Sequence, residues 1–469
     1  MEKIKKARTG ISGLDEITSG GLPAGRITLI CGGPGCGKSL FSAEFLVNGA
    51  TQFKEPGVFI AFEESTKELS ENFASLGFDM EKLQSKKLIK MDYVHIDQKE
   101  IEETGDYDLE GLFIRIAHAI KSVGAKRLVL DTIENLFFGL SNHGILRSEL
   151  RRLFKWLKEQ DVTTIITGER GNGTLTRHGL EEYVSDCVIL LDHRVTEQVS
   201  TRRLRIVKYR GSEHGTNEYP FLIEDDGLIV MPITSLLLDK EASTNRVSTG
   251  LPVLDKMFGG KGIYRGGSIL VSGRSGSGKT SMACTFANAA CERGERCLFF
   301  TFEESPKQLS RNMRSIGMDL ERHINKGILR IHAARPTLHG LEMHLVTIYK
   351  YVKEFKPKVV VIDPISNLTM TGNIPEIKSM VIRLIDFLQN EKITVLFTSL
   401  TSNQPGQLAE DDYIASLVDS WVIIRDEEMD DLRSFNLRIF KSSGLKSTNR
   451  VVKFELTNNG IQLTDLVKK

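Results

Sequence analysis

The chain repeats its own landmarks, and this internal repeat constrains the fold more than any other feature. Residues 9–39, TGISGLDEITSGGLPAGRITLICGGPGCGKS, recur as residues 249–280, TGLPVLDKMFGGKGIYRGGSILVSGRSGSGKT. The motif FEES at 62–65 recurs at 302–305. Landmarks in the same order at a nearly constant spacing indicate a duplicated domain, since the period is far too long for a solenoid.

The two copies predict two domains, residues 1–238 and residues 239–469. We place the boundary at the short polar stretch from Asp239 to Ser243, which has charge and no apolar periodicity. Within each copy, β-branched runs such as RITLICG alternate with helical stretches such as LRSELRRLFKWLKEQ. This alternation predicts an α/β fold in which a mainly parallel central sheet is covered by helices.

Composition excludes several classes of protein. With 40% hydrophobic and 26% charged residues among 469, the chain is typical of folded globular proteins. A net charge of +1 gives no bulk attraction to nucleic acid or to an anionic membrane, so we expect neither as a partner. The sequence shows no apolar run of about 20 residues and no secretory signal, which favours a cytoplasmic protein. The six cysteines form no CxxC pair, which argues against a zinc ribbon.

Each copy carries the P-loop pattern GxxxxGK[ST] between a β-rich run and a helical run, which predicts a site for ATP and Mg²⁺. Glycines let backbone N–H groups converge on phosphate oxygens, the lysine reaches the β and γ phosphates, and the hydroxyl ligates Mg²⁺. The alternative is a glycine-rich turn that ends in Lys-Ser by chance, and two matched occurrences disfavour it. The predicted ATP-binding residues are Gly33, Pro34, Gly35, Cys36, Gly37, Lys38 and Ser39, and Arg274, Ser275, Gly276, Ser277, Gly278, Lys279 and Thr280. Lys38 and Lys279 are also predicted to be catalytic.

Paired glutamates follow each P-loop by about 25 residues, at the end of an apolar run. In a P-loop sheet this strand end faces the γ-phosphate, so a carboxylate here can polarise the attacking water. The catalytic candidates are Glu63 and Glu64, and Glu303 and Glu304. Because adjacent side chains on a strand point to opposite faces, we favour Glu63 and Glu303 as the bases. A solvated acidic turn is the alternative.

Asp131 and Asp363 each end a hydrophobic strand-like run, the arrangement in which a carboxylate supports the Mg²⁺ shell. The predicted metal-site residues are therefore Ser39 with Asp131 and Thr280 with Asp363. A turn aspartate without a metal role is the alternative.

Together these residues resemble the KaiC branch of the RecA-like ATPases. The tandem glutamates, the segment GLEEYVSD at 179–186 and the KYRG strand at 208–211 make the match specific, and it covers nearly the whole chain. The resemblance implies two tandem RecA-like domains in a double-ring homo-hexamer with ATP between neighbours. It leaves open whether a KaiB-like or another signalling protein is a partner.

The resemblance also implies that Lys208 and Arg210 reach the γ-phosphate bound by the adjacent subunit. A cation supplied in this way adds about 10³ to 10⁵ in rate. A solvated charge on an edge strand is the alternative for Arg210. Further residues at nucleotide-contacting positions of the family are Ser75, Tyr209, Ser212, His214, Ser315 and Lys441.

The second copy departs from the family pattern in two places. Ser443 stands where the first copy has Arg210, which predicts slow hydrolysis at the second site. Family members with a phosphoryl-acceptor pair have two adjacent hydroxyl residues, whereas this chain has Ala415 followed by Ser416. Ser416 is therefore the single candidate for autophosphorylation.

Three functions remain open from the sequence. The leading one is a Mg²⁺-dependent ATPase of the KaiC type that assembles into hexamers, phosphorylates itself at Ser416 and acts in signalling or timing. The second is a RecA-like motor in DNA recombination or repair, which turnover with and without single-stranded DNA would distinguish. The third is an interaction scaffold in which ATP is a structural ligand.

Overall fold

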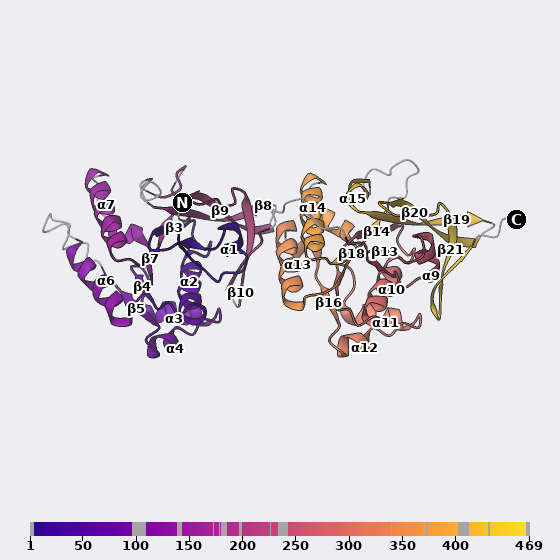
Figure 1. The fold of residues 1–469 in the computed structure, drawn as a ribbon, viewed down its shortest axis with the longest axis horizontal. Helices are drawn as coiled ribbons and strands as arrows, with labels where there is room; N and C mark the ends of the chain where they lie inside the picture. The colour runs from indigo at the N-terminus through magenta and orange to yellow at the C-terminus, as the bar shows by residue number, and fades with distance from the viewer. Residues whose placement is uncertain are drawn as a thin grey trace. The chain divides into compact units, whose positions relative to one another are not determined.

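The computed structural model divides the chain into two compact units, Met1–Ser235 and Leu236–Lys469 (Figure 1). It describes residues 4–95, 109–137, 143–171, 173–177, 179, 185–196, 199–225, 227–232, 243–338, 340–371, 374–401, 412–429 and 432–465. The domain boundary predicted between residues 238 and 239 lies outside this range and stays a prediction.

The described strands of the first unit form one large sheet with a parallel centre and an antiparallel edge. Strands β8, β3, β7, β6, β4 and β5 are parallel to their neighbours, and β9, β10 and β11 extend the sheet beside β8 in antiparallel fashion. In spatial order the strands are β11 (Gly227–Val230), β10 (Glu218–Glu224), β9 (Val199–Tyr209), β8 (Cys187–Thr196), β3 (Ile27–Gly32), β7 (Thr163–Glu169), β6 (Arg127–Asp131), β4 (Gly57–Ala61) and β5 (Ile89–Tyr93).

Helices cover both faces of this sheet, because alternate residues of its central strands are buried on opposite sides. Ile30 and Phe59 pack in one core with α2, whereas Leu29 and Val58 pack in another with α6 and α7. Figure 1 shows α6 and α7 on the opposite side of the sheet from α2. The described helical elements are α1 (Leu14–Ile17), α2 (Lys38–Gln52), α3 (Thr66–Ala74), α4 (Met80–Ser85), α6 (Glu110–Val123), η1 (Ile133–Phe137) and α7 (His143–Glu159), and a small hairpin pairs β1 (Lys6–Ala7) with β2 (Leu22–Pro23).

The second unit repeats this topology. Its parallel strands β16, β15, β17, β18, β14 and β19 continue into the antiparallel strands β20, β21 and β22. In spatial order the strands are β16 (Leu329–Ala333), β15 (Cys297–Thr301), β17 (Val359–Asp363), β18 (Thr394–Leu400), β14 (Ser268–Gly273), β19 (Ser420–Met429), β20 (Leu432–Ser442), β21 (Val451–Thr457) and β22 (Gly460–Asp465).

In this unit α10 packs on one face of the sheet, where Phe286 shares a core with Ile269 and Val271. Figure 1 shows α13 and α14 on the other side. The described helical elements are α9 (Pro252–Met257), α10 (Lys279–Glu292), α11 (Pro306–Arg314), α12 (Glu321–Asn325), η3 (Pro336–Leu338), α13 (Leu341–Phe355), η4 (Ile365–Thr371), α14 (Ile374–Asn390) and α15 (Asp412–Leu417), and β12 (Arg246–Val247) pairs with β13 (Ile263–Tyr264). The predicted α/β fold with a mainly parallel sheet in each copy is confirmed.

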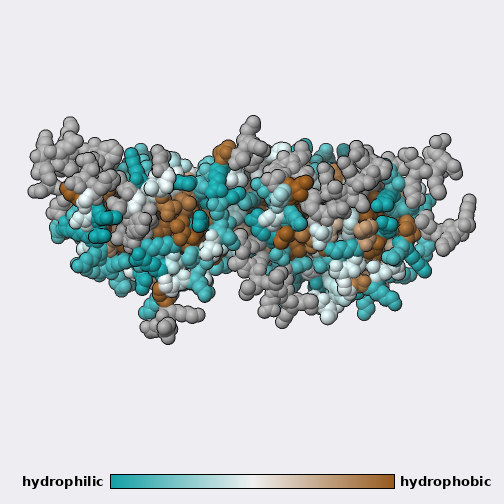
Figure 2. Space-filling view, turned by 90° about the horizontal axis from the view of Figure 1, so that it is seen from above, coloured by the Kyte–Doolittle hydropathy of each residue, from teal (hydrophilic) through white to brown (hydrophobic). Residues whose placement is uncertain are grey.

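The surface is largely polar. On the face shown in Figure 2, hydrophilic side chains surround scattered hydrophobic patches. None of the helices in the described part of the chain is long and apolar enough to cross a membrane.

Candidate functional site

The first P-loop lies between the carboxyl end of β3 and the amino end of α2. The ammonium group of Lys38 donates to the carbonyl oxygens of Gly32 and Gly33, at 3.0 and 3.1 Å. A Cβ atom added at Gly33 or Gly35 would meet nothing within 4 Å, so the inner face of the loop is open. Gly37, at the N-cap of α2, has φ of 101°, a conformation that glycine adopts without strain. The loop therefore presents backbone N–H groups and a helix N-terminus to an anion.

The second P-loop has the same arrangement with different residues. The ammonium group of Lys279 donates to the carbonyl oxygen of Arg274 at 2.7 Å, and Gly278 at the N-cap of α10 has φ of 90°. The guanidinium of Arg274 pairs with Asp426 of β19, Nη1 to Oδ2, at 3.0 Å. This ion pair connects the start of the loop to the neighbouring strand β19. The first copy cannot form it, because Gly33 stands at the position of Arg274.

A buried carboxylate lies beside the hydroxyl group of each P-loop. Asp131, at the end of β6, accepts a hydrogen bond from Thr167. Burial raises the pKa of Asp131, and hydrogen bonds from Thr167 and from Ser39 oppose that rise. The structure thus brings together the two predicted metal-site residues of the first copy.

The second copy repeats this carboxylate site. Thr280 Oγ1 donates to Asp363 Oδ1 at 3.3 Å, and Thr398 donates to the same oxygen. Burial raises the pKa of Asp363 to about 6, although both hydroxyl groups favour its charged form. A nearby cation would lower this pKa, since it stabilises the carboxylate.

These residues fit a Mg²⁺ ion. Among the described residues, no group of three or more His, Cys, Asp or Glu side chains is placed to hold a metal. Mg²⁺ commonly keeps several waters and takes one or two protein oxygens in addition to substrate phosphates. One hydroxyl and one carboxylate beside an open phosphate loop meet that requirement in each copy.

The paired glutamates of the first copy diverge. Glu63 Oε2 accepts from Thr132 Oγ1 at 3.1 Å, next to Asp131, whereas Glu64 Oε2 accepts from Asn72 Nδ2 of α3 at 3.1 Å. Glu63 therefore lies near the carboxylate of Asp131, and Glu64 contacts α3. This division agrees with our preference for Glu63 as the base, which stays a prediction.

The second pair of glutamates diverges in the same way. Glu303 Oε1 accepts from Asn367 Nδ2 of η4 at 3.2 Å, and Glu304 Oε2 accepts from Asn312 Nδ2 of α11 at 3.1 Å. The roles of Asn72 in α3 and Asn312 in α11 were not predicted from the sequence. The signal was present in the repeat, because Asn312 follows Asn72 by 312 − 72 = 240 positions, the same offset as 304 − 64 = 240 for the glutamates that they contact.

Lys208 and Arg210 lie at the opposite end of the sheet from the P-loop of their own copy. The strand register places Tyr209 opposite Cys187, and Cys187 opposite Thr28, at the amino end of β3. The P-loop begins four residues further along, at Gly32, which is roughly 13 Å at the rise of a strand. The two cations and the phosphate loop of one copy are therefore separated by the length of β3.

The residues near Lys208 and Arg210 contact other residues of the first unit. The ring of Tyr209 is buried, its hydroxyl donates to the carbonyl oxygen of Gly21 at 2.8 Å, and burial raises its pKa. Any contact of Tyr209 with a nucleotide would therefore use its backbone. Lys6, which sequence reasoning missed, donates to Ser212 Oγ at 2.7 Å, and His214 has its ring 6.2 Å from that of Tyr209.

Ser75 and Ser315 stand at the C-terminal ends of corresponding helices in the two units. Each is the C-cap residue, of α3 and of α11 respectively. Their hydroxyl groups donate to the carbonyl oxygens of Asn72 and Asn312, at 2.7 Å in both cases. They therefore lie one turn from the asparagines that contact Glu64 and Glu304.

Lys441 holds the helix that carries the candidate acceptor. Its ammonium group donates to the carbonyl oxygens of Ala415, Ser416 and Val418, at 3.1, 3.1 and 2.7 Å, and so satisfies the C-terminal end of α15. Ser416 is exposed near the end of this helix. Its counterpart Tyr183, with the rest of residues 180–184, lies outside the described residues.

The comparison with known families settles the family. The profile described as "ATPase: KaiC" matches this chain twice, over residues 7–235 and 247–468. The chain belongs to the KaiC family of ATPases. This KaiC-family chain thus consists of two tandem RecA-like domains, and the resemblance inferred from the sequence is confirmed.

Named relatives agree with this assignment over almost the full chain. The KaiC-family chain is 53% identical to "Circadian clock protein KaiC2" of Synechocystis sp. over 462 residues, which cover 98% of it and 81% of that relative. It is 36% identical to "Circadian clock oscillator protein KaiC" of Synechococcus elongatus, over 99% of its own length and 90% of the relative's. It is 35% identical to "Circadian clock protein KaiC3" of Synechocystis sp., over 98% and 92%.

Proposed function

We propose that this chain is a Mg²⁺-dependent ATPase whose active sites form between copies in a homo-hexameric double ring. The supporting observation is the distance between the two halves of the first site. The P-loop lies at the carboxyl end of β3, and Lys208 and Arg210 lie at its amino end. A site that needs both halves therefore takes one from each of two copies.

The chemistry of the first domain follows from these residues. Lys38 and the backbone N–H groups of the loop bind the phosphates, and Ser39 with Asp131 would hold Mg²⁺, which neutralises phosphate charge when bound. Glu63 orients a water for in-line attack on the γ-phosphate and accepts its proton. Lys208 and Arg210 of the next copy stabilise the charge that develops in the transition state.

The second domain has Ser443 at the position where the first domain has Arg210. Ser443 donates its backbone N–H to the carbonyl oxygen of Asp419 at 2.8 Å, just as Arg210 donates to Asp186 at 2.9 Å, so the two residues are structural counterparts. Without a guanidinium here, the second site hydrolyses ATP more slowly. The serine at position 416 then competes with water as a phosphoryl acceptor.

The relatives suggest the biological setting. Their printed names are those of circadian clock proteins, so we propose a role in timing or signalling in the cytoplasm. A KaiB-like or other signalling protein is the partner class that such a role requires. The proposed domains are residues 1–238 and 239–469.

Assembly is expected to depend on nucleotide. A γ-phosphate shared between Lys38 of one copy and Lys208 and Arg210 of the next adds binding free energy only in the oligomer. We expect hexamers in saturating Mg-ATP and smaller species after ATP is removed. Light scattering with ATP, with ADP and without nucleotide, followed by phosphate release on the same samples, measures both properties. A chain that stays monomeric in Mg-ATP contradicts the shared site.

Slow phosphorylation of Ser416 is expected in the presence of Mg-ATP. Incubation with γ-labelled ATP and phosphopeptide mapping should place the label in residues 405–425, and Ser416→Ala should remove it. Lys279→Ala serves as a control, because it disables the second P-loop and should also prevent labelling. Label that survives Ser416→Ala unchanged rules out this acceptor and leaves a plain ATPase.

A further inference from the structure

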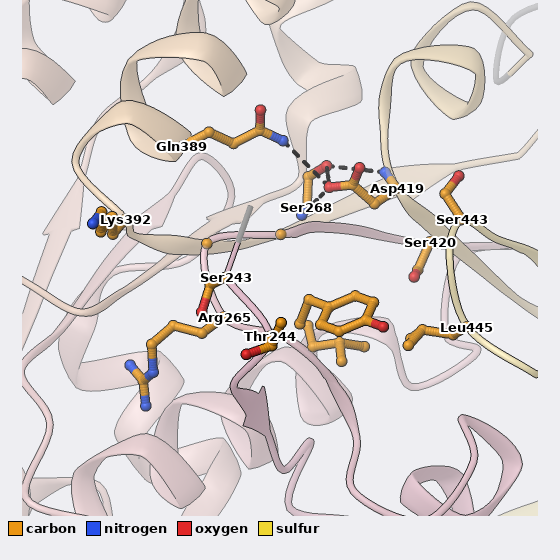
Figure 3. A pocket seen from close by; sticks show the side chains of 14 residues that line it. Ser243, Thr244, Arg265, Ser268, Gln389, Lys392, Asp419, Ser420, Ser443 and Leu445 are labelled. Atoms are coloured by element: carbon orange, nitrogen blue, oxygen red, sulfur yellow. Dashed lines mark hydrogen bonds between the residues drawn. The ribbon is translucent and has the colours of Figure 1, made fainter. Parts of the chain in front are cut away.

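A pocket lies within the second unit, away from the P-loop of that unit. Its volume is about 480 Å³, which is within the usual range for small-molecule sites. It opens at the amino end of β14, where Ser268 begins the strand, whereas the P-loop follows the carboxyl end at Gly273. Figure 3 shows the side chains that line it, with Ser268, Gln389 and Asp419 joined by hydrogen bonds at one side.

Asp419 is the acidic group of this pocket. Its Oδ2 atom accepts hydrogen bonds from the backbone N–H and the hydroxyl of Ser268, both at 2.8 Å, and from Gln389 Nε2 at 3.3 Å. All these donors are neutral and reach the same oxygen. Within the described part of the chain, no lysine, arginine or histidine forms an ion pair with Asp419.

The matching carboxylate of the first unit is paired with two cations. Asp186 precedes β8 as Asp419 precedes β19. Lys158 Nζ lies 2.8 Å from Asp186 Oδ2, and Arg26 Nη1 lies 3.8 Å from Asp186 Oδ1. The first unit therefore supplies its own positive charge to this carboxylate.

The second unit has neither cation at the matching positions. Lys158 is the next-to-last residue of α7, and Gln389 is the next-to-last residue of α14. Arg26 comes directly before β3, and Gly267 comes directly before β14. Gly267 and Gln389 carry no charge, so neither balances the carboxylate of Asp419. Gly267 also has no side chain to fill the space, and both residues line the pocket.

The other walls favour a ligand with an apolar body. Ile263, Tyr264 and Leu445 line the pocket, and Tyr264 is held in place because its hydroxyl donates to the carbonyl oxygen of Gly444 at 3.2 Å. Arg265 also lines the pocket, but it pairs with Glu295. Figure 3 shows Arg265 and Lys392 on the side away from Asp419.

We propose that this pocket binds a small organic cation, a primary amine or guanidinium on an apolar body, with its charge at Asp419. The ligand supplies the positive charge that Lys158 and Arg26 supply in the first unit. Its apolar part packs against Tyr264 and Leu445. This pocket lies at the opposite end of β14 from the P-loop of its own unit. Its test needs neither ATP nor turnover.

The test compares two probes that share an aromatic body and differ in one group, which is charged in the first probe and neutral in the second. Tyramine carries an ammonium group on an aromatic body, and tyrosol has a hydroxyl in its place. Isothermal titration of the full chain without nucleotide should show tyramine binding at least about tenfold more tightly than tyrosol, the gain typical of a hydrogen bond to a charged group. Equal affinities, or no binding of tyramine, overturn the proposal.

Variants locate the site. Gln389→Lys restores the cation that the first unit has, so it should weaken tyramine binding at least about tenfold without unfolding the chain. Gln462→Lys, the same change at an exposed residue of β22, should leave binding unchanged. Asp419→Asn should abolish the difference between tyramine and tyrosol. Tyramine binding that persists in Gln389→Lys, or that falls equally in Gln462→Lys, overturns the proposal.

Discussion

Replacing Glu63 by glutamine is expected to lower phosphate release by about 10² to 10⁴, the range typical of a lost general base. The amide keeps the shape of the side chain and its contact with Thr132, which lies 3.1 Å from Glu63 Oε2, but it cannot accept the proton of the attacking water. ATP binding should change little, because no predicted phosphate contact is removed. Steady-state phosphate release and binding of a fluorescent ATP analogue, measured on the same preparation, separate these effects.

Two matched variants sharpen this result. Glu64→Gln should have the smaller effect, because Glu64 faces Asn72 of α3 rather than Asp131. Glu303→Gln should also remove little of the total turnover, because the second site lacks the arginine. If Glu303→Gln proves more damaging than Glu63→Gln, the ranking of the two domains is wrong. If Glu64→Gln proves more damaging than Glu63→Gln, the assignment of Glu63 as the base is wrong.

The fold and the P-loops were predictable from the sequence because both depend on local patterns. The alternation of β-branched and helical runs predicts the sheet, and each GxxxxGK[ST] motif predicts a strand before it and a helix after it. The pairing of Asp131 with Ser39 was also predictable, since the carboxyl ends of the parallel strands of one sheet lie at the same edge, and β3 and β6 are separated only by β7.

Contacts between distant segments were not predictable in this way. Lys6 reaches Ser212 from 206 positions away, and no local pattern marks that pair. The capture of the α15 carbonyl oxygens by Lys441 depends on where a helix ends relative to β20, which the sequence does not encode locally. The pocket beside Asp419 is lined by Gln389 and Gly267, where the first unit has Lys158 and Arg26, and this difference around one carboxylate becomes visible only when each unit is seen in three dimensions.

Replacing Arg210 by serine, the residue of the second copy at this position, is expected to lower turnover of the first domain by about 10³ to 10⁵. The expected loss is in the rate of the chemical step, because the guanidinium acts on charge that develops in the transition state. Arg205→Ser is the matched control, because Arg205 is an exposed arginine within β9, whereas Arg210 directly follows the end of that strand. Similar losses in both variants would indicate a general effect of removing positive charge from β9 or from the residue that follows it.

Mixing two inactive variants tests whether the site is shared between copies. Lys38→Ala removes the phosphate half of the first site, and Arg210→Ala removes the other half. If each site takes its halves from different copies, a Lys38→Ala copy can lend its Arg210 to the intact P-loop of an Arg210→Ala neighbour. Activity should then reappear when the two variants are mixed and allowed to exchange subunits. The double variant, mixed with the Lys38→Ala variant, should show no recovery, because no P-loop of a first domain remains intact. If the mixture of single variants is as inactive as each variant alone, while co-purification of differently tagged copies shows mixed oligomers, the two halves act within one copy. That outcome would require Arg210 to cross the length of β3, so it would refute the proposed site as well as its sharing.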